Sequence, residues 1–329
     1  MKKSFKNGVC GALVAVFLVG CLLSCKTTPK NTEGVVTDGG DYVAPTELNP
    51  IALLSDGYSV YARLPAQHHL ALTKEILREE IPNIQDGDVN LISNRLDIVW
   101  AAQGTEEDRS KTELIASGSI PSIALSGSLT KSRGWTKTKY SAPTTSKAKT
   151  LGYNNQFVYF GHPDTEFKIS LLYKDLLGLA ADIAPLLDRA AVHEVLAKNA
   201  RNEWISRESE DILFFITRPQ QYLHNLLGDT LTIPTDYIWG SLKYLSDEEY
   251  DMMMFMHISS PKTMPALRSM LTLAFAFLGG RVEQTDEETL VVTGVPVTQR
   301  QIVDTITRDP VTGEHFKVVN EKDIEEDEN

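Results

Sequence analysis

The spacing of apolar residues along the chain predicts short strands that alternate with amphipathic helices. Residues 58–64 alternate apolar and polar side chains until Pro65, as a half-buried strand does. Residues 66–81 carry apolar side chains close to helical spacing, which predicts an amphipathic helix. The same reasoning predicts strands at 96–102, 113–117, 135–140 and 156–160, and helices from Pro121 to about 129 and at 167–184.

This order of elements returns in the second part of the chain. A strand at 211–217 ends before Pro219, and a helix at 264–278 follows Pro261 as the earlier helix follows Pro121. We therefore predict two copies of a β-α-ββ-α-ββ-α plan, the first enlarged by insertions. Hairpins favour antiparallel sheets covered by helices, so the predicted class is α+β. The other elements of the second copy are a helix at 220–227, strands at 237–245, 250–258, 281–284 and 289–293, and a helix at 298–307.

The N-terminus has the plan of a bacterial lipoprotein signal. Three lysines precede an uncharged apolar run at 8–20, and Leu-Leu-Ser-Cys at 22–25 matches the pattern at which a lipoprotein is acylated and cleaved. The apolar run is too short for a membrane-spanning helix. Cys25 is the predicted acylated residue because the polar stretch begins at Lys26. Cys21 also fits the pattern and is the alternative, and an ordinary secretory signal is the other interpretation.

Changes in composition divide the rest of the chain. Residues 25–50 are rich in Thr, Gly, Pro and Asp, as a flexible tether is. The final residues form an acidic run that is typical of a solvated, disordered tail. The predicted organisation is a signal peptide at 1–24, a flexible tether at 25–50, an N-terminal α+β half at 51–205, a C-terminal α+β half at 206–310 and an acidic tail at 311–329.

Charge and cysteine content narrow the classes of function. The formal net charge of the 329 residues is −12, and loss of residues 1–24 removes three lysines and no acid, which leaves −15. Phosphates would be repelled, so a nucleic-acid partner is not expected. All three cysteines (Cys10, Cys21 and Cys25) precede residue 26, so the predicted folded part has no disulfide, thiol nucleophile or cysteine metal ligand.

No motif gives a positive reason to predict an enzyme. Residues 128–131 spell Ser-Xaa-Xaa-Lys, but the companion triplets of penicillin-recognising enzymes do not occur. Residues 86–90 place oxygens as a calcium loop does, yet the sixth position is Leu91 instead of Gly, so a surface turn is expected. His68 and His69 are adjacent and cannot share a helix face. We expect no catalytic residue, no metal and no cofactor.

Two predicted helices have more apolar surface than one sheet contact requires. Residues 167–184 form a broad apolar face that includes Leu172, Leu176 and Ile183, with charged side chains opposite. Residues 264–278, which include Met270 and Phe275, are apolar nearly all round. Such helices either fill a core or lie in a membrane interface, and the sequence leaves both interpretations open.

A second candidate surface is basic. Residues 114–163 contain no Asp or Glu, although the chain as a whole is acidic, and Trp135 lies among several lysines that include Lys137 and Lys139. Lysines are attracted to anionic membranes, and Trp prefers the headgroup level. The alternative is a solvated loop rich in Ser, Thr and Lys.

Several stretches are similar to one known family. Residues 57–65 (Gly-Tyr-Ser-Val-Tyr-Ala-Arg-Leu-Pro), 116–121 (Ala-Ser-Gly-Ser-Ile-Pro), 132–139 (Ser-Arg-Gly-Trp-Thr-Lys-Thr-Lys) and 280–292 resemble the treponemal outer-membrane-associated lipoproteins. The resemblance spans about 55–308 and departs from the family at 167–198, which is longer and more apolar. It implies a periplasm-facing lipoprotein that lays amphipathic helices into the inner leaflet of the outer membrane. It also implies closed and open forms around an apolar cavity.

Together these observations predict an envelope lipoprotein that binds lipid or apolar ligands, inserts amphipathic helices and alters the permeability of the bilayer. The expected partners are membrane lipids, reached through the acylated cysteine and the helices, and an apolar ligand. The alternative is a non-catalytic envelope scaffold or assembly partner whose helices only fill its core. The expected lipid contacts are Trp135, Lys137, Lys139, Leu172, Leu176, Ile183, Met270 and Phe275.

Overall fold

The computed structural model describes residues 48–80, 85–104, 112–119, 126–127, 129–140, 156–162, 167–173, 175–192, 194, 196–220, 233–246 and 248–307. The predicted acylation at Cys25 or Cys21, the tether before residue 48 and the acidic tail lie outside these residues. So do the predicted helix at 220–227, apart from Gln220, and most of the one at 121–129.

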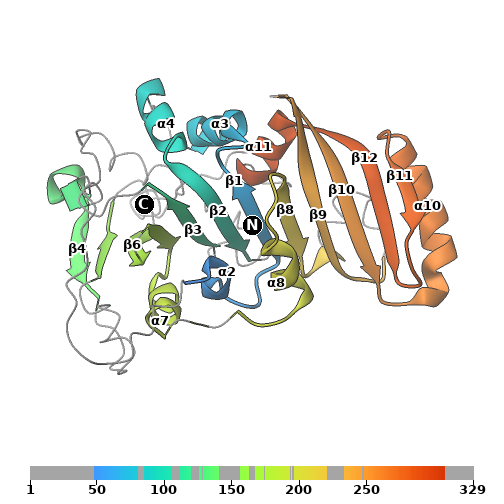
Figure 1. Cartoon of the computed structure of the whole chain (residues 1–329), viewed down its shortest axis with the longest axis horizontal. Coiled ribbons are helices and arrows are strands. Elements are labelled where there is room, and N and C mark those ends of the chain that lie inside the picture. The colour runs from blue at the N-terminus through green and yellow to red at the C-terminus, as the bar shows by residue number, and fades with distance from the viewer. Residues whose placement is uncertain are drawn as a thin grey trace, which may run out of the picture.

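One antiparallel sheet organises the described part of the chain (Figure 1). Its strand order is β11-β12-β10-β9-β8-β1-β2-β3-β7-β6-β5-β4, and β8 pairs with β1 across the predicted boundary at 205/206. Helices and antiparallel strands together confirm the α+β class. The strands are β1 (Val60–Pro65), β2 (Leu96–Gln103), β3 (Thr112–Gly118), β4 (Thr136–Lys139), β5 (Phe157–Phe160), β6 (Lys168–Tyr173), β7 (Leu176–Ala180), β8 (Ile212–Ile216), β9 (Thr235–Ser246), β10 (Glu249–Ile258), β11 (Arg281–Gln284) and β12 (Thr289–Thr298).

Helices cover both faces of this sheet, because successive strand residues point to opposite sides. On β3, Ala116 packs against α3 and α4, whereas its neighbour Ile115 packs in the cluster formed by α2, α7 and α8. The first face also carries α10 and α11. The helices are α2 (Pro50–Leu53), α3 (Leu70–Glu80), α4 (Asp86–Ser93), α7 (Ala184–Val192), α8 (Ala200–Ile205), α10 (Met264–Ala276) and α11 (Gln299–Thr307), with 3₁₀ turns η2 (Lys131–Arg133) and η4 (Pro261–Thr263).

The predicted helix at 167–184 is wrong. These residues form the β6–β7 hairpin, and helical structure begins only at Ala184. Both strands are buried on both faces, so they read as a continuous apolar run, which periodicity cannot distinguish from a buried helix. The first copy of the predicted repeat therefore does not have the element order that we expected. Residues 86–90, predicted as a surface turn, are instead the beginning of α4.

The end of the predicted tether belongs to the core. Asn49 caps α2 by accepting a hydrogen bond from the Ile51 amide at 3.0 Å, and Leu48, Ile51, Leu53 and Leu54 pack beside α7. Polar contacts fix the same segment. The buried Glu113 carboxylate accepts from the Ser55 amide and hydroxyl at 2.7 and 2.6 Å, and pairs with Arg189 at 2.8 Å.

Candidate functional site

The helix α10 lies at one end of the sheet, and local sequence fixes both of its ends. The turn η4 begins with Pro261, whose ring suits the first turn of a helix. At the other end, Gly279 has a φ of +83° and the Gly280 amide donates to the Phe275 carbonyl at 2.9 Å. A left-handed glycine with such a back-directed bond is a common way to end a helix. The helix thus has defined limits at 264 and 276.

One face of α10 is packed into the core. Met264, Leu267, Leu271 and Phe275 recur at helical spacing and are all buried. They contact a cluster formed by β9 to β12. Phe275 is only 1% exposed, so the structure places this expected lipid contact in the core.

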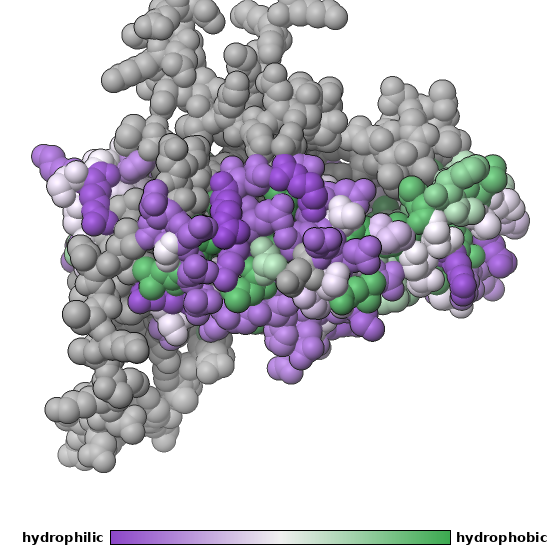
Figure 2. Space-filling model, turned by 90° about the horizontal axis from the view of Figure 1, so that it is seen from above, coloured by the Kyte–Doolittle hydropathy of each residue, from purple (hydrophilic) through white to green (hydrophobic). Residues whose placement is uncertain are grey.

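The opposite side of α10 presents large apolar side chains to solvent. Leu273 is 66% exposed, and Phe277 and Leu278, just after the helix, are 86% and 47% exposed. Within the described residues only six large hydrophobic side chains are exposed, and these are three of them. Figure 2 shows hydrophobic atoms gathered at the α10 end of the molecule, where the rest of the visible surface is mostly hydrophilic. Met270 lies half-buried between the two faces. We call Met270, Leu273, Phe277 and Leu278 the α10 stripe.

The polar residues of α10 satisfy their own hydroxyl groups. The Ser269 hydroxyl donates to the Pro265 carbonyl at 2.9 Å, and the Thr272 hydroxyl donates to the Arg268 carbonyl at 2.7 Å. These bonds run back along the helix and need no water. These two hydroxyl groups can therefore approach a region of low water content at little cost.

The length of α10 limits what it can do at a membrane. Thirteen residues rise about 20 Å, which is less than the roughly 30 Å hydrocarbon thickness. Across the described ranges, no helix is long and apolar enough to cross a bilayer. The geometry instead suits a helix that lies in an interface with one side immersed.

The structure separates the other predicted contact residues. Leu172 and Ile183 are buried in the core and Leu176 is half-buried, because the hairpin and the turn after it replace the expected helix face. Trp135 is also buried, at 2% exposed, and its ring lies against His162 with 4.9 Å between centroids. The turn η2 folds it onto the sheet, so its predicted place among exposed lysines is wrong.

The two predicted lysines remain at the surface. Lys137 and Lys139 are exposed on β4, the last strand of the sheet at the end away from α10 (Figure 1). The Lys137 ammonium lies 3.8 Å from the ring centroid of Phe157, a cation–π contact on the neighbouring strand. Beside this strand the Tyr140 hydroxyl donates to Asp188, and burial together with that hydrogen bond raises the pKa of Tyr140.

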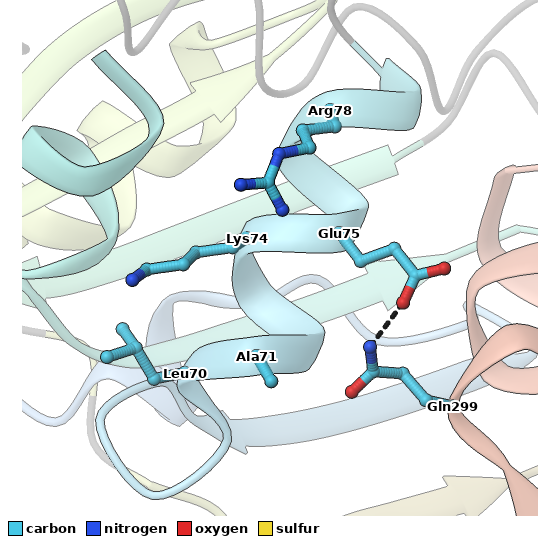
Figure 3. A pocket seen from close by; sticks show the side chains of 6 residues that line it. All are labelled: Leu70, Ala71, Lys74, Glu75, Arg78 and Gln299. Atoms are coloured by element: carbon cyan, nitrogen blue, oxygen red, sulfur yellow. Dashed lines mark hydrogen bonds between the residues drawn. The ribbon is translucent and has the colours of Figure 1, made fainter. Parts of the chain in front are cut away.

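A hollow between α3 and α11 is a weaker candidate site than the α10 stripe. Lys74, Glu75, Arg78 and Gln299 line this open groove (Figure 3). Glu75 accepts a hydrogen bond from Gln299, and Arg78 pairs with Asp86 at 2.9 Å. Arg300 extends the same junction by pairing with Glu79. In the described ranges no group of three His, Cys, Asp or Glu residues could hold a metal ion.

Sequence reasoning found α10 but missed its outward residues. Met270 and Phe275 were the expected contacts, whereas Leu273, Phe277 and Leu278 carry the exposed surface. A helical wheel would have divided the helix into a 264-267-271-275 face and a 266-270-273-277 face. It could not have said which of two apolar faces meets the sheet.

Comparison with known proteins agrees with this architecture. Crystal form III of TP0453 matches with a TM-score of 0.60 and 16% identity, over 79% of this chain and 98% of that one. Crystal form I matches with a TM-score of 0.59 and 16% identity, over 79% and 96%. At this identity the likeness establishes the fold alone. No curated protein matches the chain in sequence. The family model of the outer membrane-associated lipoprotein TP0453 matches residues 45–303, and the chain therefore belongs to that lipoprotein family.

Proposed function

We propose that this protein is a lipid-anchored envelope protein that inserts the α10 stripe into a bilayer and alters its permeability. The exposed Leu273 and Phe277, on a helix whose other face is packed on the sheet, carry the proposal. The outer-membrane association of the family supports a place in the envelope, and we propose the periplasmic face of the outer membrane. Acylation of Cys25 would hold the stripe near the lipid. Residues 167–184 no longer contribute, since they form core strands.

The size of the apolar surface makes insertion favourable. Complete removal of a Leu or Phe side chain from water contributes about 1.5–3 kcal/mol. The exposed parts of Leu273 and Phe277 would then contribute about 3 kcal/mol together, or roughly a hundredfold in binding. The buried face is already removed from water and gains little from lipid, so α10 enters while still attached to the sheet.

Replacement of both Leu273 and Phe277 by glutamine should abolish leakage from liposomes while the protein stays folded. Both side chains point outward, so the loss falls on lipid contact and spares the core. Dye release and urea unfolding would be measured on the same samples. The matched control is Ser269→Gln with Thr272→Gln, on exposed polar positions of the same helix, which should release dye as the unmodified protein does. Normal release by the Leu273/Phe277 variant would refute insertion of the stripe.

The second candidate function is an envelope scaffold in which another protein covers the stripe. The exposed apolar surface favours it as well, because such patches also mark protein interfaces. Light scattering coupled to size exclusion tests this directly. A self-associated species that Leu273→Gln with Phe277→Gln converts to monomer, without any liposome leakage by the unmodified protein, would select the scaffold.

The exposed lysines of β4 lead to a separate prediction about vesicle binding. Replacing Lys137 and Lys139 by glutamate should weaken binding to anionic vesicles, on the order of tenfold or more, because each lysine near such a surface contributes about 1 kcal/mol. Raising the salt concentration should weaken binding by the unmodified protein in the same direction. Vesicle co-sedimentation measures both effects. Identical binding to neutral and anionic vesicles would count against a role for this strand.

A further inference from the structure

The segment that contains α10 has an unusual charge for this chain. Residues 261–282 include Lys262, Arg268 and Arg281 but no Asp or Glu, although the whole chain has a net charge of −12. None of these three cations forms an ion pair with a carboxylate in the described ranges. Their charge is therefore available to a partner.

Two of the cations belong to α10 or to the turn at its start, and neither is part of the α10 stripe. Lys262 is exposed in η4 at the start of the helix, and Arg268 is exposed on its polar side. Arg281 belongs elsewhere, because its neighbour Val282 packs under α10 and alternate strand residues point to opposite faces. Both Lys and Arg can keep an apolar stem against lipid while the charge stays at the headgroup level.

We infer that α10 selects bilayers with anionic headgroups, through Lys262 and Arg268, and this inference rests on the proposed insertion of the α10 stripe. The apolar side chains of the α10 stripe would determine how deeply the helix enters the bilayer. The two cations would determine which headgroups it prefers. The carboxylate-free composition of 261–282 is the complement of an anionic surface. Lys262, Arg268 and the α10 stripe lie at the opposite end of the sheet from Lys137 and Lys139. The proposed selectivity of α10 is therefore independent of those lysines.

A second copy of the chain fits this surface less well. Two-fold pairing of α10 helices would bring the cations of the two copies closer together, and the 261–282 segments supply no carboxylate to offset them. Like charges brought together in an interface oppose association. A bilayer with anionic headgroups has a charge opposite to that of the two cations and an apolar interior that suits the α10 stripe.

The experiment uses the full chain in its acylated form with an environment-sensitive fluorophore on Leu278→Cys, which leaves Leu273 and Phe277 intact. Once Cys25 is acylated, cleavage having removed Cys10 and Cys21, the new thiol is the one free label site, and mass spectrometry checks this. The anchor keeps every variant on the vesicles, as flotation verifies. Probe emission then reports only whether α10 enters lipid. Vesicles of phosphatidylcholine are compared with vesicles that also contain phosphatidylglycerol.

The expected result is deeper insertion into the anionic vesicles, with a preference on the order of fivefold for each cation. The Lys262→Gln/Arg268→Gln variant should lose that preference. The protein that keeps both cations should lose it at high salt concentration. The matched control, Lys137→Gln with Lys139→Gln, should leave the probe response unchanged.

Three results would overturn the inference. Equal insertion into both vesicles, or a preference that survives Lys262→Gln with Arg268→Gln, excludes these cations as selectors while the proposed function stands. A probe shift without vesicles, accompanied by dimers in light scattering, assigns the surface to a second copy. Absence of any shift on either vesicle refutes insertion itself, and with it the proposed function.

Discussion

Replacing Glu113 with alanine is expected to lower the free energy of unfolding by about 3–5 kcal/mol. The carboxylate lies in β3 at the centre of the fold and is nearly inaccessible to water. It pairs with Arg189 of α7 and accepts both the amide and the hydroxyl of Ser55. Arg189 also donates to the Leu53 carbonyl at 2.5 Å. Removing the carboxylate leaves a largely buried guanidinium without its counter-charge and the Ser55 amide without its acceptor.

Urea unfolding followed by circular dichroism measures this effect. The matched control is Asp86→Ala, which removes the exposed ion pair with Arg78 and should cost less than about 1 kcal/mol. Substituting both Glu113 and Arg189 by alanine should cost less than the sum of the single changes, because no unpaired charge remains. A Glu113→Ala protein as stable as the Asp86→Ala protein would show that this pair does not hold the 48–55 segment.

Substitution of Gly240 by valine should destabilise the protein by about 3 kcal/mol or more. Gly240 lies in β9, and a Cβ atom there would be 2.3 Å from the Met253 carbonyl oxygen and 2.5 Å from the Phe214 ring. The first contact is with backbone, which cannot move without disturbing the sheet. The Gly240 carbonyl also accepts the indole N–H of Trp204 at 3.1 Å, so the strain would reach α8.

The matched control is a glycine in open space. Gly87 lies in the first turn of α4 and has nothing within 4 Å of the Cβ position, so Gly87→Ala should be neutral or stabilise by about 0.4–1 kcal/mol. Thermal unfolding compares the two variants, and near-ultraviolet circular dichroism reports the surroundings of Trp204. A Gly240→Val protein with unchanged stability would mean that β9 and β10 are not as close at this point as the contacts require.

Sequence was most informative where one face of a strand or helix meets solvent. The hairpin predicted at 237–245 and 250–258 is present as β9 and β10, and the last predicted helix is present as α11. In such elements the apolar positions face the core and the polar positions face solvent. The repeat of apolar residues along the sequence therefore distinguishes a helix from a strand. The α+β class followed from these elements and from the hairpin connections.

The pattern failed where both faces are buried. In residues 167–180 the contrast disappears, and a hairpin has the appearance of an apolar helix. Gly178 was the one local sign, since a Cβ there would lie 2.7 Å from the Leu172 side chain. A glycine in close contact with a neighbouring side chain is common in packed strands, but the contact is invisible without the partner.

For the site, the sequence alone determined that 264–278 is an apolar helix with few charges, because composition and spacing are local properties. It did not determine which apolar face is free. Phe275 and Phe277 are two positions apart and chemically identical, yet one is 1% and the other 86% exposed. Only the docking of α10 on β9 to β12 decides between them. Burial depends on which surfaces meet in three dimensions, and that choice is made by residues distant along the chain.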